Sequence, residues 1–440
     1  MSHTPTSSAE SSSASSRACR LPIGPIPTTT ALSMIRSLPR KKFIEDDFAM
    51  SCPTTQGVAM RASLFGHAAP MGTASARRAR HRRRSMLIAI SWSAVGVGRY
   101  LGTRRTGNMT PREIVRRTLE FGGPARVARS FDGSDFKGAG CKARTRATDW
   151  QALGDGRWQR TDEWGNTWSR IDPTSKGEVV RGVLENLSDL DGYTFPDYTH
   201  AEDYAEVVQL RVEHGDHWLI GHMPGFAFNI ARKMRKLDQY LMDLVTEPDW
   251  ISTLHDRIDV MLADMIRNFA GAGADSVMFP EDWGTQTQTL ISPELWHQEF
   301  QPRFATLCGL AHDLGLRVFM HSCGQIRAIV PGLIDAGIDV LQFDQPDLHG
   351  IDTLAAYQQD SRITFWCPVD IQQVLPRGDE RVIRDKARQM LDELWRGRGG
   401  FIAGYYGDNV SIGIDPAWQD SACDEFVCSG VRSRYKTDET

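Results

Sequence analysis

The sequence has no apolar run as long as the roughly 20 residues that a membrane-spanning helix needs. It also lacks a clustered set of cysteines, because the eight that it contains are scattered over 440 residues. A chain of this length does not need disulfides to hold its fold. We therefore expect a protein of the reducing cytoplasm, without a membrane partner, in which any special cysteine is catalytic or metal-bound.

Basic residues are scarce over most of the chain. Residues 109–440 contain 35 Lys and Arg against 51 Asp and Glu, a net charge of −16, although the whole chain carries only −4. Nucleic-acid binding depends on neutralising phosphates, so this acidic region argues against a nucleic-acid partner. An apolar content of 41% is enough for one large core or two modest ones.

The first 108 residues lack sustained helical or strand periodicity. They begin with a Ser-rich segment and hold 16 Lys and Arg against 4 acidic residues, with a basic cluster at 77–84 before an apolar run at 86–98. Such a cluster and run suit a targeting signal, but a secretory signal belongs at the N-terminus. We expect residues 1–108 to be a disordered, targeting or spurious basic extension, with an interaction arm as a further alternative and Met109 as a candidate start. Residues 431–440 are expected to be a polar tail.

From Met109 onward the chain has the pattern of a folded domain. Thr110 and Pro111 mark a helix start, and residues 162–168 suit a hairpin with its turn at Gly165-Asn166. Apolar strands then alternate with helical segments: strands near 217–223, 276–282, 317–321, 340–343, 363–369 and 401–406, and helices near 227–245, 248–270, 292–314, 325–336, 351–358 and 379–396. Continuously apolar strands indicate a parallel sheet covered by helices. We predict a (β/α)8 TIM barrel over residues 109–430. A doubly wound sheet is the alternative, but no Gly-rich phosphate turn follows a strand.

The polar residues at the strand ends are the candidate site, because parallel barrels place their active sites there. They are His222, Glu281, Asp282, His321, Cys323, Asp344, Gln345, Cys367, Asp370, Tyr405, Tyr406 and Asp408. His321 and Cys323 are two positions apart on a strand end, so their side chains project the same way. Imidazole and thiolate are preferred zinc ligands. The alternative is a structural cysteine beside a capping histidine.

Further ligands and substrate contacts remain open at this point. Cys367, Glu281 and Asp282 are candidate additional metal ligands, although Cys367 also suits a small core residue. Asp282 also suits a general acid or base. Residues 283–286 after it suit either a wall of the pocket or a helix-capping turn. Tyr405 and Tyr406 suit either donors to a substrate oxygen or residues that close the barrel mouth.

Several segments together resemble the uroporphyrinogen decarboxylase superfamily. They are Met109-Thr-Pro-Arg-Glu-Ile-Val115, Gly273-Ala-Asp275, Glu281-Asp-Trp-Gly-Thr-Gln286, His321-Ser-Cys-Gly324, Asp370-Ile-Gln-Gln-Val-Leu-Pro376 and Gly399-Gly-Phe-Ile402. The resemblance implies a (β/α)8 barrel. The superfamily contains the haem-pathway decarboxylase and the zinc, corrinoid-dependent methyltransferases, and His321-x-Cys323-Gly resembles the zinc motif of the methyltransferases. In that branch zinc activates a thiol such as coenzyme M, which takes a methyl group from a methylcobalamin carrier.

The chain departs from both branches. The Arg-Gln-Ala-Gly-Arg-Tyr segment that holds substrate carboxylates in the decarboxylase has no counterpart here. The third zinc ligand of the methyltransferases, a Cys in a late Gly-Cys-Gly segment, is also missing, because residues 403–407 contain no cysteine. Cys367 or a carboxylate takes its place, or a metal is bound only weakly or not at all.

The resemblance implies an enzyme that carries out zinc-assisted methyl transfer from a corrinoid or a methylated small molecule to a thiol. The alternatives are a porphyrinogen decarboxylase and a non-catalytic binder of a corrinoid or tetrapyrrole. A small-molecule substrate is expected, with a corrinoid protein as a candidate partner and the oligomeric state open. We assign Asp282, Glu281 and Tyr405 to catalysis and His321, Cys323 and Cys367 to the metal. The expected substrate-binding residues are His222, Trp283, Gln286, Asp344, Gln345, Asp370 and Tyr406.

Overall fold

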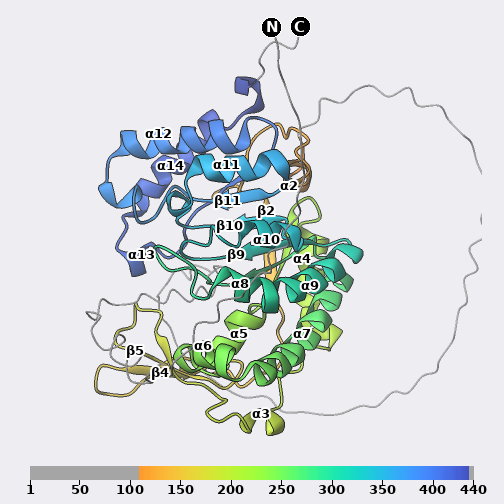
Figure 1. Ribbon diagram of the computed structural model, residues 1–440. Coiled ribbons are helices and arrows are strands. Elements are labelled where there is room, and N and C mark those ends of the chain that lie inside the picture. Colours follow the sequence, from red (N-terminus) through yellow and green to blue (C-terminus); the bar gives the residue numbers. More distant parts are fainter. Residues whose placement is uncertain (1–108, 436–440) are drawn as a thin grey trace, which may run out of the picture. The chain divides into compact units, whose positions relative to one another are not determined.

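The computed structural model describes residues 109–435, so the expectations for residues 1–108 and for the last five residues lie outside the described part. Eight parallel strands form one curved sheet in the order β1-β12-β11-β10-β9-β8-β7-β2 (Figure 1). The strands are β1 (Ala128–Arg129), β2 (Phe136–Gly140), β7 (Trp218–His222), β8 (Ser276–Pro280), β9 (Arg317–His321), β10 (Val340–Gln342), β11 (Thr364–Cys367) and β12 (Phe401–Ala403). This sheet confirms the predicted (β/α)8 barrel.

Asp135 connects the two ends of this sheet, which are the consecutive strands β1 and β2. Its backbone N–H donates to the Arg129 carbonyl oxygen at 3.0 Å, and its Oδ2 accepts from the Arg129 N–H at 2.9 Å. The Arg126 guanidinium also donates to both Asp135 carboxylate oxygens, at 2.8 and 2.5 Å. The side chain of a buried aspartate therefore supplies hydrogen bonds between two strands that do not pair directly.

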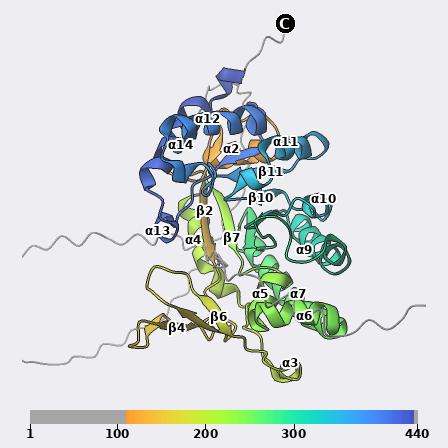
Figure 2. The same cartoon turned by 60° about the vertical axis from the view of Figure 1, so that its left-hand side comes forward.

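Helices cover the outer side of the sheet (Figures 1 and 2). They are α2 (Pro111–Leu119), α4 (Ala205–Glu213), α5 (Ala227–Met234), α6 (Leu237–Thr246), α7 (Pro248–Gly271), α9 (Gln301–Asp313), α10 (Val330–Asp335), α11 (Ile351–Asp360), α12 (Glu380–Met390) and α14 (Pro416–Ser429). Shorter turns of helix are α3 (Asp189–Gly192), α8 (Pro293–Leu295), α13 (Asn409–Ile412), η1 (Ala201–Tyr204), η2 (Trp296–Phe300), η3 (Pro346–Leu348), η4 (Leu375–Arg377), η5 (Leu391–Trp395) and η6 (Arg432–Tyr435). None of the described helices combines the length and apolarity needed to cross a membrane.

Two helix boundaries differ from the expected ones. The helix expected over 227–245 is divided into α5 and α6, because Lys236 has a positive φ of 68° that ends the first helix. The helix expected over 325–336 begins only at Val330, because Gln325 forms a β-bridge with Thr285, whose carbonyl accepts from the Gln325 N–H at 2.7 Å.

Alternate side chains of the strands fill two different layers. Those pointing into the barrel form a compact aromatic and aliphatic cluster, in which the Phe136 and Trp366 rings stack with centroids 5.0 Å apart. Those pointing outward pack against the helices and form the larger core. The parallel strands are therefore buried on both faces, as their continuously apolar sequences predict.

A second, antiparallel sheet lies between β2 and β7 in the sequence. It contains β3 (Gln151–Ala152), β4 (Trp158–Thr161), β5 (Thr167–Arg170) and β6 (Glu178–Arg181), and we call it the inserted sheet. It confirms the predicted hairpin, whose turn is held by Asp162 through hydrogen bonds from the backbone N–H groups of Trp164 and Asn166, the Asn166 amide and the Trp168 indole, at 2.7 to 3.0 Å. The inserted sheet lies beside α5 and α6 (Figures 1 and 2).

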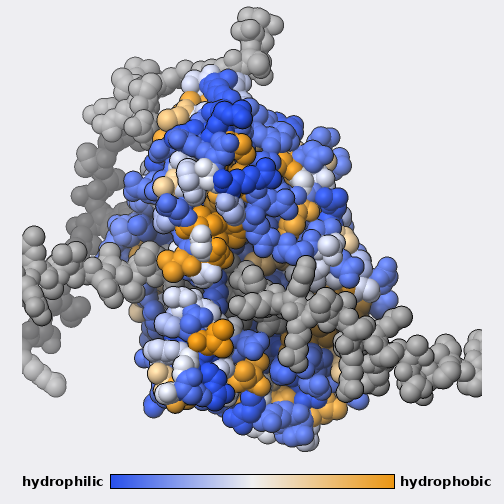
Figure 3. Space-filling view, turned by 90° about the vertical axis from the view of Figure 1, so that its left-hand side faces the viewer, coloured by the Kyte–Doolittle hydropathy of each residue, from blue (hydrophilic) through white to orange (hydrophobic). Residues whose placement is uncertain are grey.

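The surface on the side of the inserted sheet is mainly hydrophilic. Figure 3 shows hydrophobic side chains there in small groups between charged and polar ones.

The last described residues of the chain contact the segment before β1. Val431 pairs with Arg126, and the Arg432 N–H donates to the Ala125 carbonyl oxygen at 3.0 Å. The described part of the expected tail therefore packs onto the barrel.

Asp275 generates a prediction about the stability of the barrel. This buried carboxylate accepts from Arg112 Nε at 3.0 Å, from Arg211 Nη2 at 2.5 Å and from the Leu219 N–H at 2.8 Å, and so joins α2, α4 and β7 at the start of β8. We expect Asp275→Ala to lower the free energy of unfolding by about 3 kcal/mol, because three donors lose their acceptor. Urea denaturation measures the change.

The control for this prediction is Asp264→Ala. Asp264 pairs with Arg267 at 2.8 Å on the exposed side of α7, and such surface pairs contribute less than about 1 kcal/mol. Equal urea midpoints for the two variants would contradict the role assigned to Asp275.

Candidate active site

Three potential metal ligands meet at the ends of β8 and β9. His321 is the last residue of β9, Cys323 follows two positions later, and Asp282 lies just after β8. His321 Nε2 is 3.3 Å from Cys323 Sγ and 3.4 Å from Asp282 Oδ1, and the three donor atoms lie within 4.8 Å of one another. His321 and Asp282 are buried and Cys323 is half-buried. We call these residues the ligand group.

The backbone explains why the ligand group forms here. The loop after β8 crosses the loop after β9 so closely that a Cβ atom on Gly284 would lie 2.5 Å from the Gly324 carbonyl carbon. Gly324 also has a φ of +75°, which favours glycine. The Cys323 N–H donates to Asp282 Oδ1 at 3.1 Å, and the Gly284 N–H donates to the Cys323 carbonyl at 3.2 Å. The two glycines therefore let the loops approach until their side chains converge.

A chain of hydrogen bonds fixes the orientation of the His321 ring. Its Nδ1 bonds to the Gln342 amide oxygen, and the Gln342 amide nitrogen donates to Asp344 Oδ1 at 2.8 Å. Because an amide oxygen only accepts, Nδ1 is the donor in this pair. Nε2 then faces Cys323 and Asp282, an arrangement that is usual for a metal-binding histidine.

Charge also favours a cation at this place. Burial alone would raise the pKa of Asp282, but its hydrogen bond with His321 and the charges of His321 and Arg232 hold that pKa below its usual range. Burial opposes protonation of His321, but the hydrogen bond with Asp282 and the charges of Asp344 and Asp282 outweigh it and raise the pKa of His321 to about 9. Arg232 Nη2 lies 3.2 Å from Asp282 Oδ2. The same carboxylates would stabilise a bound metal cation.

Glu281 lies next to Asp282 but has a different surrounding. Its Oε1 accepts from the backbone N–H groups of Phe226 at 2.7 Å and Asn229 at 3.0 Å, at the start of α5. Its Oε2 is buried and has no hydrogen-bond partner among residues 109–435. Burial raises the pKa of Glu281 to about 8. The side chain thus anchors α5, the helix that supplies Arg232.

Three further predicted residues lie around the ligand group. His222 lines the same cavity as His321, and burial lowers its pKa to about 4. Asp344 is buried, its Oδ2 has no partner within the described residues, and burial raises its pKa. Gln345 Oε1 accepts from the Gly324 N–H at 3.1 Å, and so supports the loop that carries Cys323.

Other predicted residues are not brought to the ligand group. Cys367 is fully buried in the layer between the sheet and the helices, where burial raises the pKa of its thiol. The Trp283 ring stacks on Phe228 with centroids 3.9 Å apart, inside an aromatic cluster, and Gln286 is exposed. Asp370 accepts from the backbone N–H groups of Gln372 and Gln373, at 2.8 and 2.7 Å, and so caps its own loop.

The two tyrosines lie at the end of β12. The Tyr405 hydroxyl accepts from the Asn409 amide at 3.2 Å. The Tyr406 backbone N–H donates to Gln419 Oε1 at 2.8 Å, and its hydroxyl accepts from Lys176 Nζ at 3.3 Å. Tyr406 therefore contacts a residue that belongs to the loop between β5 and β6 of the inserted sheet.

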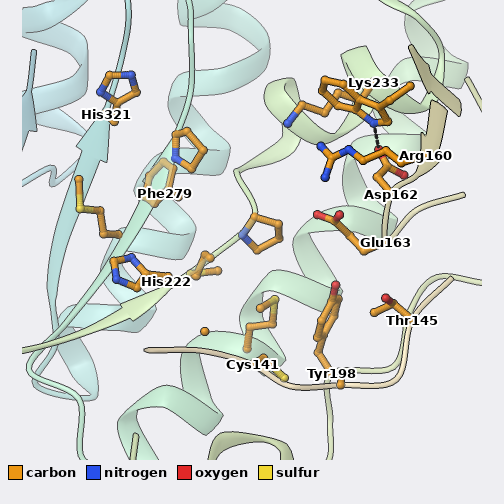
Figure 4. A pocket seen from close by; sticks show the side chains of 18 of the residues that line it. Cys141, Thr145, Arg160, Asp162, Glu163, Tyr198, His222, Lys233, Phe279 and His321 are labelled. Carbon is orange, nitrogen blue, oxygen red and sulfur yellow. Dashed lines mark hydrogen bonds between the residues drawn. The ribbon is translucent and has the colours of Figure 1, made fainter. Parts of the chain in front are cut away.

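A cavity of about 370 Å³ extends from the ligand group to the inserted sheet. Figure 4 shows His222, Phe279 and His321 on one side of it and Arg160, Asp162, Glu163 and Lys233 on the other. Sequence reasoning missed the three cations that line this cavity, Arg160, Lys176 and Lys233. The tryptophan-rich hairpin at 162–168 was the available signal, but only tertiary packing places it against the barrel.

One family model and several solved structures are similar to this chain. A model of the uroporphyrinogen decarboxylase (URO-D) family matches residues 172–417, which is more than half of the chain and includes the ligand group. Among solved structures, a methyltransferase from Methanosarcina mazei matches with 15% identity and a TM-score of 0.46, over 59% of this chain and 74% of that chain. A B12-independent methionine synthase from Shewanella sp. W3-18-1 matches with 9% identity and a TM-score of 0.36, over 60% and 70%. No curated protein matches the chain.

The crossing of the two loops generates a prediction. We expect Gly284→Ala to lower the free energy of unfolding by about 1–3 kcal/mol, because the new Cβ meets backbone atoms that cannot rotate away. The measurement is the unfolding temperature by calorimetry. Gly309→Ala is the control, since a Cβ there, in α9, has open space around it and improves helix propensity. An unchanged unfolding temperature in Gly284→Ala would show that the loops separate without cost.

Proposed function

Since the chain belongs to the uroporphyrinogen decarboxylase family and is an enzyme of that superfamily, we propose that it transfers a methyl group to a thiol with the help of zinc. The methyl donor would be a corrinoid or a methylated small molecule. One observation carries the proposal: an imidazole nitrogen, a thiol sulfur and a carboxylate oxygen converge within 4.8 Å at the strand ends. Two of these groups belong to the sequence motif, and Asp282 would serve as the third ligand.

The residues present fit zinc. Nitrogen, sulfur and oxygen donors are its usual protein ligands, and three of them leave a fourth position open, as in catalytic sites. Two of the three donors are also held by neighbours: His321 by Gln342, and Asp282 by Arg232 and by the Cys323 N–H. When bound there, zinc would lower the pKa of a coordinated thiol and so supply a thiolate at neutral pH.

The protein's own groups would place the reacting partners. His321 borders the cavity, so a thiol that enters the cavity reaches the ligand group from that side. Met265, Met278 and Phe279 give this cavity an apolar wall, which limits water near the nucleophile. His222 is held neutral by its low pKa. A volume of about 370 Å³ lies at the lower end of the usual range for ligand sites and favours a small substrate.

Porphyrinogen decarboxylation is the second candidate. It is favoured by Asp282, a buried carboxylate whose pKa is below its usual range and which therefore stays ionised. Such a group can stabilise a protonated pyrrole without any metal. This candidate assigns Asp282 to the substrate instead of a cation, so the two candidates make different predictions for metal content.

Metal analysis of the purified protein tests the proposal. We expect one zinc ion per chain, and we expect Cys323→Ser and His321→Ala to lose it, because each variant removes one of three ligands. Cys367→Ser is the matched control: this cysteine is equally close to a strand end but lies outside the ligand group, so zinc should be retained. Elemental analysis gives the stoichiometry.

Activity separates the two candidates. Methylcobalamin and a simple thiol, 2-mercaptoethanesulfonate, serve as donor and acceptor, and loss of methylcobalamin absorbance measures transfer. We expect the zinc-loaded protein to transfer the methyl group, and we expect the rate of transfer by Cys323→Ser to be lower by at least about a hundredfold. Metal-free protein that still decarboxylates a porphyrinogen would exclude the methyl-transfer proposal and support the second candidate.

A further inference from the structure

Three cationic side chains line the cavity, and Figure 4 shows two of them, Arg160 and Lys233, at the end away from the ligand group. Arg160 comes from β4, Lys176 from the loop between β5 and β6, and Lys233 from the last turn of α5. Residues 109–440 carry a net charge of −16, but residues 136–181, which supply Arg160 and Lys176, contain nine Lys and Arg against six Asp and Glu. All three are half-buried rather than extended into solvent.

Arg160 is held in place by aromatic rings. Its guanidinium carbon lies 5.1 Å from the Trp150 ring centroid and 4.9 Å from the Trp168 ring centroid. Its Nε is buried and has no hydrogen-bond partner within the described residues. Stacked rings fix the plane of a guanidinium but do not replace the hydrogen bonds that it makes in water. Arg160 is therefore oriented in advance.

Two other arginines, both in or near α5, are placed differently. Arg232 contacts Asp282, and Arg235 donates to Asp243 at 2.6 Å. These guanidiniums neutralise carboxylates of the fold itself. By contrast, Arg160 is directed toward the cavity, where Figure 4 shows its guanidinium near the Lys233 side chain.

Lys233 adds a second cation at the same place. Its Nζ lies 5.7 Å from the Trp168 ring centroid, so the same indole borders both Lys233 and Arg160. Lys176 lies farther along the rim, where it is 3.6 Å from Asp408 and 3.3 Å from the Tyr406 hydroxyl. Lys176 therefore already contacts a carboxylate of the fold, at the rim of the cavity.

Two carboxylates at this end must be considered. Asp162 accepts hydrogen bonds from four donors of its own turn, so its oxygen atoms are directed away from a ligand. Glu163 lines the cavity and faces the charges of Lys233 and Arg160, and burial raises its pKa. One carboxylate therefore faces two cations, and a second acidic group can be accommodated between them.

We propose that Arg160 and Lys233 bind a carboxylate of the substrate, whose reacting atom is then held at the other end of the cavity beside His321. The guanidinium supplies two parallel N–H donors, which match the two oxygens of a carboxylate, and Lys233 supplies a further charge. The substrate is thus an organic acid small enough for the cavity. This inference rests on the proposed function for the position of the reacting atom. Arg160 lies outside residues 172–417, the range that the family model matches, so we infer that the acid selectivity comes from the inserted sheet.

The experiment compares acids with their uncharged amides. Aliphatic and aromatic carboxylates of increasing length, from acetate to 4-phenylbutyrate, are titrated into the full-length protein by calorimetry beside the corresponding primary amides. We expect the best acid to bind about 10 to 100 times more tightly than its amide, as charge-assisted hydrogen bonds would give. Arg160→Gln and Lys233→Gln should each remove most of this preference and leave amide binding unchanged.

Arg170→Gln is the matched control. Arg170 belongs to the same inserted sheet, stacks on the same Trp150 ring at 4.3 Å and also has a buried Nε without a partner among the described residues, but it does not line the cavity. The Arg170→Gln variant should therefore keep the preference for the acid over its amide. Arg160→Lys, which keeps the charge and loses the second donor, should retain part of it, and unfolding temperatures show that every variant is folded.

Two results would overturn the inference: no acid that binds more tightly than its amide, or a loss in Arg170→Gln as large as in Arg160→Gln. Zinc content is measured on the same samples. Full zinc without acid preference contradicts only this inference, and acid preference without zinc contradicts only the proposed function.

Discussion

The close crossing of the loops after β8 and β9 is the constraint on which the candidate site depends. Parallel strands bring His321 and Asp282 to the same edge of the barrel, but neighbouring strand ends are still several ångströms apart. Glycine at 284 and 324 removes the two Cβ atoms that would hold the loops apart. The Cys323 N–H then reaches Asp282, and thiol, imidazole and carboxylate become neighbours. The chemistry of the site therefore depends on two residues without side chains.

Much of this arrangement could be predicted from the sequence, because it follows from local rules. Alternation along a strand predicted that His321 and Cys323 project together, and the apolar runs predicted a parallel barrel. The position of Cys367 could not be predicted in this way. A parallel strand is buried on both faces, so its sequence does not indicate which of two adjacent residues faces the barrel interior. The register places Trp366 opposite Gln342, which is opposite His321. Trp366 therefore occupies the inner layer, and Cys367 points toward the helices.

The cationic end of the cavity could not be predicted for a different reason. Net charge is a sum over the chain, whereas a binding site depends on the few charges that packing brings together. The acidic composition argued against a nucleic-acid partner, but it gave no information about three cations that are spread over more than 70 positions of the sequence. The inserted sheet also lies outside the matched range of the family model for most of its length. Its contribution becomes visible only when the hairpin is placed beside α5.

Helix α5 links the two ends of the cavity. Glu281 accepts from the backbone N–H groups of Phe226 and Asn229, at distances of 2.7 and 3.0 Å, and so fixes the start of this helix next to Asp282. Near its other end, Arg232 turns back to Asp282, whereas the next residue, Lys233, extends over Trp168 to the inserted sheet. Successive residues of one short helix thus serve opposite ends of the cavity. All residues of α5 except Lys233 are buried, so a shift of this helix would move both ends of the cavity together. The distance between the ligand group and the cationic end is therefore set by the fold rather than by a loop.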